Sequence, residues 1–171
     1  KSAITDDLSM IKKFKYSIAI PSLTIYGQFP SNISVSQILT SIKRIGFDEV
    51  IEDTIGADIS IFLVKEYLLK KPEMIYPLIN SSCPAIIRLI QIRFPDLIPN
   101  IIDIETPVEI TARIAKTEVS KKMGIDIKDI GVFFITPCTA RVTSIRNPLG
   151  ISESYLDGAI SIKDIYGEIV R

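Results

Sequence analysis

Short apolar runs and longer stretches of helically spaced apolar residues alternate along the chain. The short runs predict buried strands at residues 16–20, 47–52, 74–79, 131–136 and 158–160. Apolar residues three or four positions apart predict helices at 35–45, 55–71, 84–93, 107–123 and 162–171. Because strands alternate with helices, the pattern predicts an α/β fold with a mostly parallel sheet flanked by helices.

Capping residues and the lack of linkers indicate how the chain is organised. Ser34 stands where an N-cap is expected, and Thr106, which precedes a proline, is typical of a helix start. There is no repeat, low-complexity stretch or Gly/Ser linker, so residues 16–171 are predicted to form one domain. Residues 1–15 are polar and do not begin with Met, so we expect them to be a lead-in from a larger protein.

Composition and charge limit the kinds of molecule that the chain is expected to bind. The 171 residues are 47% hydrophobic and 23% charged, which excludes disorder by composition. The 20 basic residues balance the 20 acidic ones, so no net field attracts the chain to nucleic acid, and Lys12, Lys13 and Lys15 are interpreted as a solvated face. No uncharged apolar run approaches the ~18–20 residues of a membrane span. We therefore predict a cytoplasmic protein with no nucleic-acid partner and no membrane span.

The residue types that the chain lacks exclude several kinds of catalysis. There is no histidine, which excludes Ser-His-Asp and Cys-His catalysis and zinc sites with imidazole ligands. None of the 8 glycines belongs to a phosphate-binding loop motif. The 2 cysteines, Cys83 and Cys138, are the remaining candidates for metal or redox chemistry, and their spacing fits neither a disulfide scaffold nor a zinc ribbon.

Both cysteines come directly after predicted strands. Cys83 follows the 74–79 run, and Cys138 follows the 131–136 run. Since ligands collect at the carboxyl ends of parallel strands, the two thiols are expected to share one edge of the sheet if these strands are neighbours. Cys83 also precedes Pro84 at a helix start, where the helix dipole stabilises a thiolate. The residues alone leave two interpretations open: structural cysteines, or a metal or redox site.

Several segments resemble, in order, the large-subunit catalytic domain of iron-only (FeFe) hydrogenases. Asn80-Ser81-Ser82-Cys83-Pro84 is similar to the family's first signature, Thr-Ser-Cys-Cys-Pro. Thr136-Pro137-Cys138-Thr139-Ala140-Arg141 is similar to the second signature, Met-Pro-Cys-x-x-Lys-x-x-Glu. Two further blocks, residues 94–100 and 157–165, resemble family segments as well, so the resemblance runs from about residue 16 to the end.

This resemblance implies a cofactor. Cys83 and Cys138 would be two of the four thiolate ligands of a cubane 4Fe-4S cluster, which in this family adjoins a di-iron subsite. Thr136, Pro137 and Arg141 would then lie beside the cofactor. The other two ligands belong to a third signature, which has no counterpart in residues 1–171 and would lie beyond them. We therefore expect a truncated, hydrogenase large-subunit-like domain that holds no cluster by itself.

The departures from the family pattern indicate weak or absent hydrogen turnover. Ser82 stands where active members have a proton-relay cysteine, and Ser144 replaces a glutamate that continues the proton path. A hydroxyl does not titrate near neutral pH, whereas a thiol with a pKa of ~8.5 can pass protons there. Arg141 also replaces a lysine and Thr136 replaces a methionine, and a guanidinium is not an equivalent donor to an ammonium.

Three functional hypotheses follow. The first is an iron–sulfur-binding, hydrogenase-like domain with a redox- or hydrogen-sensing role, joined in one polypeptide to ferredoxin-like or signalling modules. The second is a working iron-only hydrogenase with an unusual proton relay. The third is a metal-free α/β interaction domain. Iron–sulfur cluster assembly proteins that are related to these hydrogenases share the fold, which keeps a non-enzymatic function open.

Overall fold

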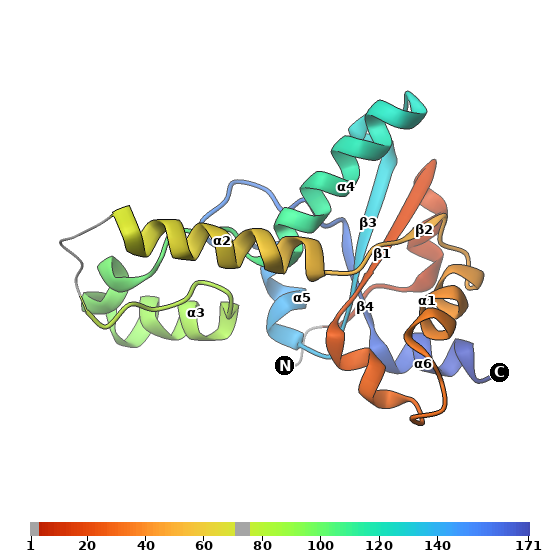
Figure 1. Ribbon diagram of the computed structural model, residues 1–171, viewed down its shortest axis with the longest axis horizontal. Coiled ribbons are helices and arrows are strands. Elements are labelled where there is room, and N and C mark those ends of the chain that lie inside the picture. The colour runs from red at the N-terminus through yellow and green to blue at the C-terminus, as the bar shows by residue number, and fades with distance from the viewer. Residues whose placement is uncertain (1–3, 71–75) are drawn as a thin grey trace.

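The computed structural model describes residues 4–70 and 76–171, and its centre is a four-stranded sheet (Figure 1). The strands are β1 (Tyr16–Pro21), β2 (Glu49–Val50), β3 (Ile130–Thr136) and β4 (Gly158–Ser161), and they lie in the order β2-β1-β3-β4. Every neighbouring pair runs parallel. The predicted α/β fold with a parallel sheet flanked by helices is confirmed.

The helices lie close to their predicted positions. They are α1 (Val35–Arg44), α2 (Thr54–Lys70), α3 (Pro84–Arg93), α4 (Pro107–Met123), α5 (Thr139–Arg146) and α6 (Ile162–Ile169), together with the short 3₁₀ helices η1 (Leu8–Lys13), η2 (Leu23–Gln28), η3 (Pro95–Asn100) and η4 (Ile127–Asp129). Ser34 caps α1 through a capping box with Gln37. The sequence did not predict α5, because its residues are mostly polar and only Val142 is buried, so no apolar helical period appears.

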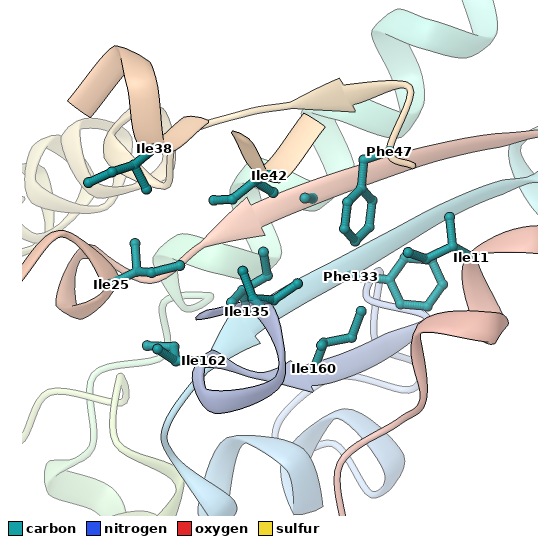
Figure 2. Close-up of a cluster of buried hydrophobic side chains, with 11 residues drawn as sticks. Ile11, Ile25, Ile38, Ile42, Phe47, Phe133, Ile135, Ile160 and Ile162 are labelled. Atoms are coloured by element: carbon teal, nitrogen blue, oxygen red, sulfur yellow. The ribbon is translucent and has the colours of Figure 1, made fainter. Parts of the chain in front are cut away.

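Side chains alternate between the two faces of the sheet and build two cores. Figure 2 shows the first, in which Phe133 and Ile135 of β3 pack with residues of α1 and α6 such as Ile42 and Ile162. On the opposite face, Ile18, Ile20, Val132 and Phe134 pack against α4 through Val108, Ala112, Ala115 and Val119. Because both faces are covered, the sheet forms the middle layer of three.

Helix α2 crosses α4 and extends away from the sheet (Figure 1). The two helices approach closely at Gly56, whose amide donates to the hydroxyl of Thr111 at 3.0 Å. A Cβ atom added at Gly56 would lie 2.8 Å from the carbonyl carbon of Pro107 and closer still to the carbonyl oxygen. This crossing fixes the start of α2 against the start of α4.

Two predictions about local structure need correction. Residues 74 and 75 of the predicted 74–79 strand lie outside the described residues, and Ile79 makes only an isolated parallel bridge to Ile101, outside the four-stranded sheet. Thr106 does precede α4, but its hydroxyl makes no capping hydrogen bond. The helix start is instead favoured by Pro107 at its first position.

The described part of the predicted lead-in packs on the sheet. Ile11 of η1 is buried in the first core. The amide and a carboxylate oxygen of Asp6 pair with the carbonyl and amide of Ala159 in β4 at 2.7 and 2.8 Å. Within residues 4–70 and 76–171, no helix has the length and apolar character needed to cross a membrane.

Candidate functional site

Two helices begin at the two cysteines. Cys83 is the N-cap of α3 and Cys138 is the N-cap of α5, both in extended backbone conformation. Neither side chain makes a capping hydrogen bond, and both cysteines are free and exposed. Since the N-terminal end of a helix attracts negative charge, both sulfur atoms lie where an anionic group is stabilised.

Strand β3 delivers Cys138 to the carboxyl edge of the sheet, as the sequence predicts. Thr136, the last residue of β3, is buried, and its hydroxyl accepts a hydrogen bond from the amide of Cys138 at 3.2 Å. Pro137 lies exposed between them. The end of the strand therefore fixes the backbone from which the thiol projects.

Cys83 is held by a different part of the fold. The carbonyl of Ile79 accepts from the amide of Ile102 at 2.9 Å, and the hydroxyl of Ser81 donates to the carbonyl of Ile104 at 2.6 Å. The predicted strand before Cys83 is therefore not part of the sheet, so the condition that it neighbours β3 is not met. Its segment is anchored to residues 100–104, outside the sheet.

Arg141 connects the two cysteine segments. From the first turn of α5, its guanidinium donates a hydrogen bond to the carbonyl of Ser82, the residue before Cys83. Burial lowers the pKa of Arg141, while the facing Cys138, Asp53, Cys83 and Glu109 act in the opposite direction. One cation therefore lies within electrostatic range of both cysteines, and an arginine stays charged at any working pH.

Two carboxylates near Arg141 were not predicted from the sequence. Asp53 lies between β2 and α2, and burial raises its pKa to about 6, with the hydroxyl of Thr111 and the charge of Arg141 opposing the rise. Burial also raises the pKa of Glu109, which accepts from the Ser154 hydroxyl at 2.6 Å and the Tyr155 amide at 2.8 Å. Asp53 comes shortly after a strand, as Cys138 does, so its position in the sequence could have marked it as a candidate site residue.

A cavity of about 470 Å³ adjoins Arg141. Its walls include Ile87 of α3, Val108 and Glu109 of α4, and Ser144 of α5. The Ser144 hydroxyl donates to the carbonyl of Arg141 at 3.2 Å, so it is engaged within its own helix.

The hydroxyl of Thr106, in the same wall, is buried and has no hydrogen-bond partner among the described residues. A buried polar atom of this kind marks a site where a partner is expected.

The two thiols are the right kind of ligand for an iron–sulfur cluster, but they are half of the ligands that a cubane cluster needs. A cubane cluster is held by four thiolates, and this chain contributes two free thiols, in segments linked by the hydrogen bond from the half-buried Arg141 to the carbonyl of Ser82. In the part of the chain that the structure describes, no group of three or more His, Cys, Asp or Glu side chains could hold a metal ion. The roles of Cys83 and Cys138 as ligands, and of Thr136, Pro137 and Arg141 beside a cofactor, remain predictions.

The parallel sheet flanked by helices defines an α/β protein, and two of its helices, α3 and α5, begin at the two cysteines. A family model, "Iron only hydrogenase large subunit, C-terminal domain", matches residues 15–168, and the chain belongs to this family. The family resemblance stated from the sequence is confirmed.

Similar proteins fall into two groups. Iron hydrogenase 1 of Clostridium pasteurianum is 27% identical over 114 residues, which are 66% of this chain and 20% of that protein. The probable cytosolic Fe-S cluster assembly factor oxy-4 of Caenorhabditis elegans is 28% identical over 158 residues, 90% of this chain and 35% of that protein. The chain therefore spans between a fifth and about a third of these two relatives.

Solved structures share the fold. An apo FeFe-hydrogenase from Chlamydomonas reinhardtii superimposes with a TM-score of 0.70 at 25% identity, over 91% of this chain and 43% of that chain. The match thus extends over nearly all of this chain and less than half of the hydrogenase chain.

Proposed function

We propose that this chain is one half of an iron–sulfur cluster-binding, hydrogenase-like domain that senses redox state or hydrogen in the cytoplasm. The observation that carries the proposal is that two free, exposed cysteines lie at helix N-termini, in segments joined by the hydrogen bond from the half-buried Arg141 to the carbonyl of Ser82. When bound, a 4Fe-4S cluster supplies one-electron redox chemistry. Two further thiolates, from residues outside the 171 of this chain, would complete the ligand set.

The two cysteines and the residues beside them each have a role in this proposal. Cys83 and Cys138 hold the cluster through their thiolates. Thr136 fixes the backbone of Cys138 through the hydrogen bond to its amide. Arg141 offsets negative charge at the thiolates and holds the carbonyl of Ser82, and Pro137 keeps the strand from continuing past the site.

Sensing is favoured over turnover because the two relay positions carry hydroxyls. Ser82 and Ser144 cannot exchange protons by ionising near neutral pH. The Ser144 hydroxyl is also occupied by the carbonyl of Arg141. A domain of this kind would pass its signal to ferredoxin-like or signalling modules in the same polypeptide. If a di-iron subsite is present, it would lie close to these residues.

The second candidate is a role in cluster assembly without catalysis. It is favoured by the relative oxy-4, a probable cytosolic Fe-S cluster assembly factor whose match extends over 90% of this chain. A working hydrogenase and a metal-free interaction domain remain as alternatives, and each gives a different experimental result. A hydrogenase evolves hydrogen at a high rate once matured, and a metal-free domain retains no iron.

The proposal is tested by anaerobic reconstitution of the complete polypeptide followed by iron and sulfide analysis. We expect Cys83→Ser and Cys138→Ser each to lower the cubane content sharply, because each removes one of four ligands. The control Asp58→Asn changes an exposed carboxylate of α2 and should leave the cluster content unchanged. Full cluster content in both cysteine variants would contradict the proposal, because other residues would then hold the cluster. Absence of iron from the reconstituted wild type would favour the metal-free alternative.

A further inference from the structure

Helix α2 carries apolar residues on all of its sides, and most of them are exposed. Among its residues only Gly56 and Ser60 are buried, and these lie on the side where α2 meets α4. Ile55, Phe62 and Leu69 are seven residues apart, so they lie along another side of the helix, and their exposed fractions are 48%, 60% and 70%. A helix that is apolar all round is typical of the interior of a larger protein. The sequence of α2 is therefore suited to a covered position that this chain alone does not provide.

Helix α3 exposes a second apolar stripe, which begins at Cys83. Ile86, Leu89 and Ile92 follow this N-cap residue in steps of three, so they lie along one side of the helix, and all three are exposed. Both helices lie at the end of the molecule away from α1 and α6 (Figure 1). We call the exposed large apolar side chains of α2, α3 and the segment after α3 the apolar arm surface: Ile55, Ile61, Phe62, Leu63, Leu68, Leu69, Ile86, Leu89, Ile92, Phe94 and Ile98.

The charges of α2 indicate what kind of molecule fits this surface. The helix has two acidic residues, Asp58 and Glu66, and two basic ones, Lys65 and Lys70. Glu66 and Lys70 form an ion pair at 2.7 Å. Surfaces that bind acidic lipids or nucleic acid carry an excess of basic residues, and α2 has no such excess. An exposed apolar surface without it is typical of contact with another protein surface.

Two observations indicate which polypeptide covers the arm. The solved hydrogenase chain that shares this fold is more than twice as long as the matched part, since 43% of it is covered. The proposed ligand set lacks two thiolates, and exposed Cys83 stands at the start of the α3 stripe. A polypeptide seated on α3 therefore reaches the thiol that needs further ligands beside it.

We propose that the apolar arm surface is the docking surface for the rest of the hydrogenase-like domain, the half that carries the two missing thiolates. This deepens the proposed function, on which it rests, because docking on α3 brings those ligands to Cys83. The docked half presents an apolar surface of its own, since burial of apolar area drives the association. Residues of α2 and α3 that are exposed in this chain are then covered in the complete polypeptide.

Hydroxyl-radical footprinting of the complete polypeptide, without lipid, measures this cover directly. Ile92 and Ile127 are compared because identical side chains have the same intrinsic reactivity, and their exposed fractions in this chain are 68% and 48%. Ile127 belongs to η4, just before β3, so it lies at the opposite edge of the sheet from Cys138. We expect Ile92 to be oxidised about fivefold or more slowly than Ile127, because the centre of a protein interface excludes water.

A matched pair of variants tests the link between docking and the cluster. Ile92→Lys places a charge in the docking surface, so oxidation of Phe62, on the other helix, should rise severalfold and the 4Fe-4S content should fall. The control Ile127→Lys should change neither quantity. Since both side chains are exposed in this chain, neither substitution should disturb its fold, which circular dichroism checks.

The outcomes separate this proposal from the proposed function. Oxidation of Ile92 as fast as that of Ile127 would overturn the docking surface, and full cluster content in the same sample would leave the proposed function standing. Protection that is lost on dilution would assign the surface to a second copy and would also overturn the proposal. Protection in a reconstituted protein that retains no iron would support docking and contradict the proposed function. If Ile92→Lys does not fold, the comparison of Ile92 with Ile127 in the wild type still decides.

Discussion

The crossing of α2 and α4 gives the sharpest prediction about stability. Substitution of Gly56 by Ala places a Cβ atom 2.8 Å from the carbonyl carbon of Pro107, and closer to two oxygen atoms, of which one belongs to the backbone. The backbone cannot rotate away, so the two helices must separate. The Thr111 hydroxyl that accepts from the Gly56 amide would be displaced as well.

The expected cost combines three effects. Overpacking costs about 1–3 kcal/mol, and loss of the hydrogen bond between Gly56 and Thr111 adds about 0.5–1.5 kcal/mol. The better helix propensity of alanine returns about 1 kcal/mol. The net loss is therefore about 2 kcal/mol, which lowers the melting temperature by roughly 4–8 °C in a chain of this size.

Gly167 of α6 supplies the matched control. It is also helical, but nothing lies within 4 Å of an added Cβ atom. Gly167→Ala should therefore stabilise the chain by up to about 1 kcal/mol through propensity alone. Urea and thermal unfolding of both variants give the comparison. If Gly56→Ala is as stable as Gly167→Ala, the described helix crossing is wrong.

Three further predictions concern buried charge and turnover. Lys116→Met should destabilise the chain by about 3 kcal/mol in urea unfolding, because it leaves the Asp157 carboxylate, 2.7 Å from the ammonium, without its ion pair; an unchanged stability would contradict this. The pKa of Asp53 is raised to about 6, against 3.8 for an unperturbed aspartate, so its protonated form adds stability that is present below pH 4 and is lost as the pH rises through 6. After allowance for partial exposure, this contribution is about 1–2 kcal/mol. Asp53→Asn should abolish this part of the pH dependence, as urea unfolding at a series of pH values would show. In the complete, matured protein, Ser82→Cys combined with Ser144→Glu should raise hydrogen evolution by about tenfold or more, and a wild type that already evolves hydrogen at the rate of a relay-competent enzyme would contradict the sensing proposal.

The strands and most helices could be predicted because their signals are local. The residues of β3 are all buried, and the apolar run from Gly131 to Thr136 predicts a buried strand at this place. Ser34 likewise caps α1 with a partner only three residues away. Such features depend on neighbours in the sequence, so one sequence is enough to find them.

Features built by distant residues could not be predicted in this way. The segment before Cys83 has an apolar run like a sheet strand, but it pairs with residues 100–104, and periodicity cannot tell one partner from another. The position of Asp53 against Thr111 depends on how α2 crosses α4, where the absence of a side chain at Gly56 lets the two helices meet. The sequence thus predicted both cysteines as site residues and missed the partly buried carboxylate of Asp53.

The central claim is that Cys83 and Cys138 hold one iron–sulfur cluster together. The most direct measurement is the electron paramagnetic resonance spectrum of the complete, reconstituted protein after one-electron reduction, compared between the wild type, Cys83→Ser and Cys138→Ser. We expect a reduced cubane signal in the wild type that is lost or altered in the same way by either substitution, since both remove a ligand of the same cluster. An unchanged signal in both variants would show that the cluster is held elsewhere and would contradict the claim.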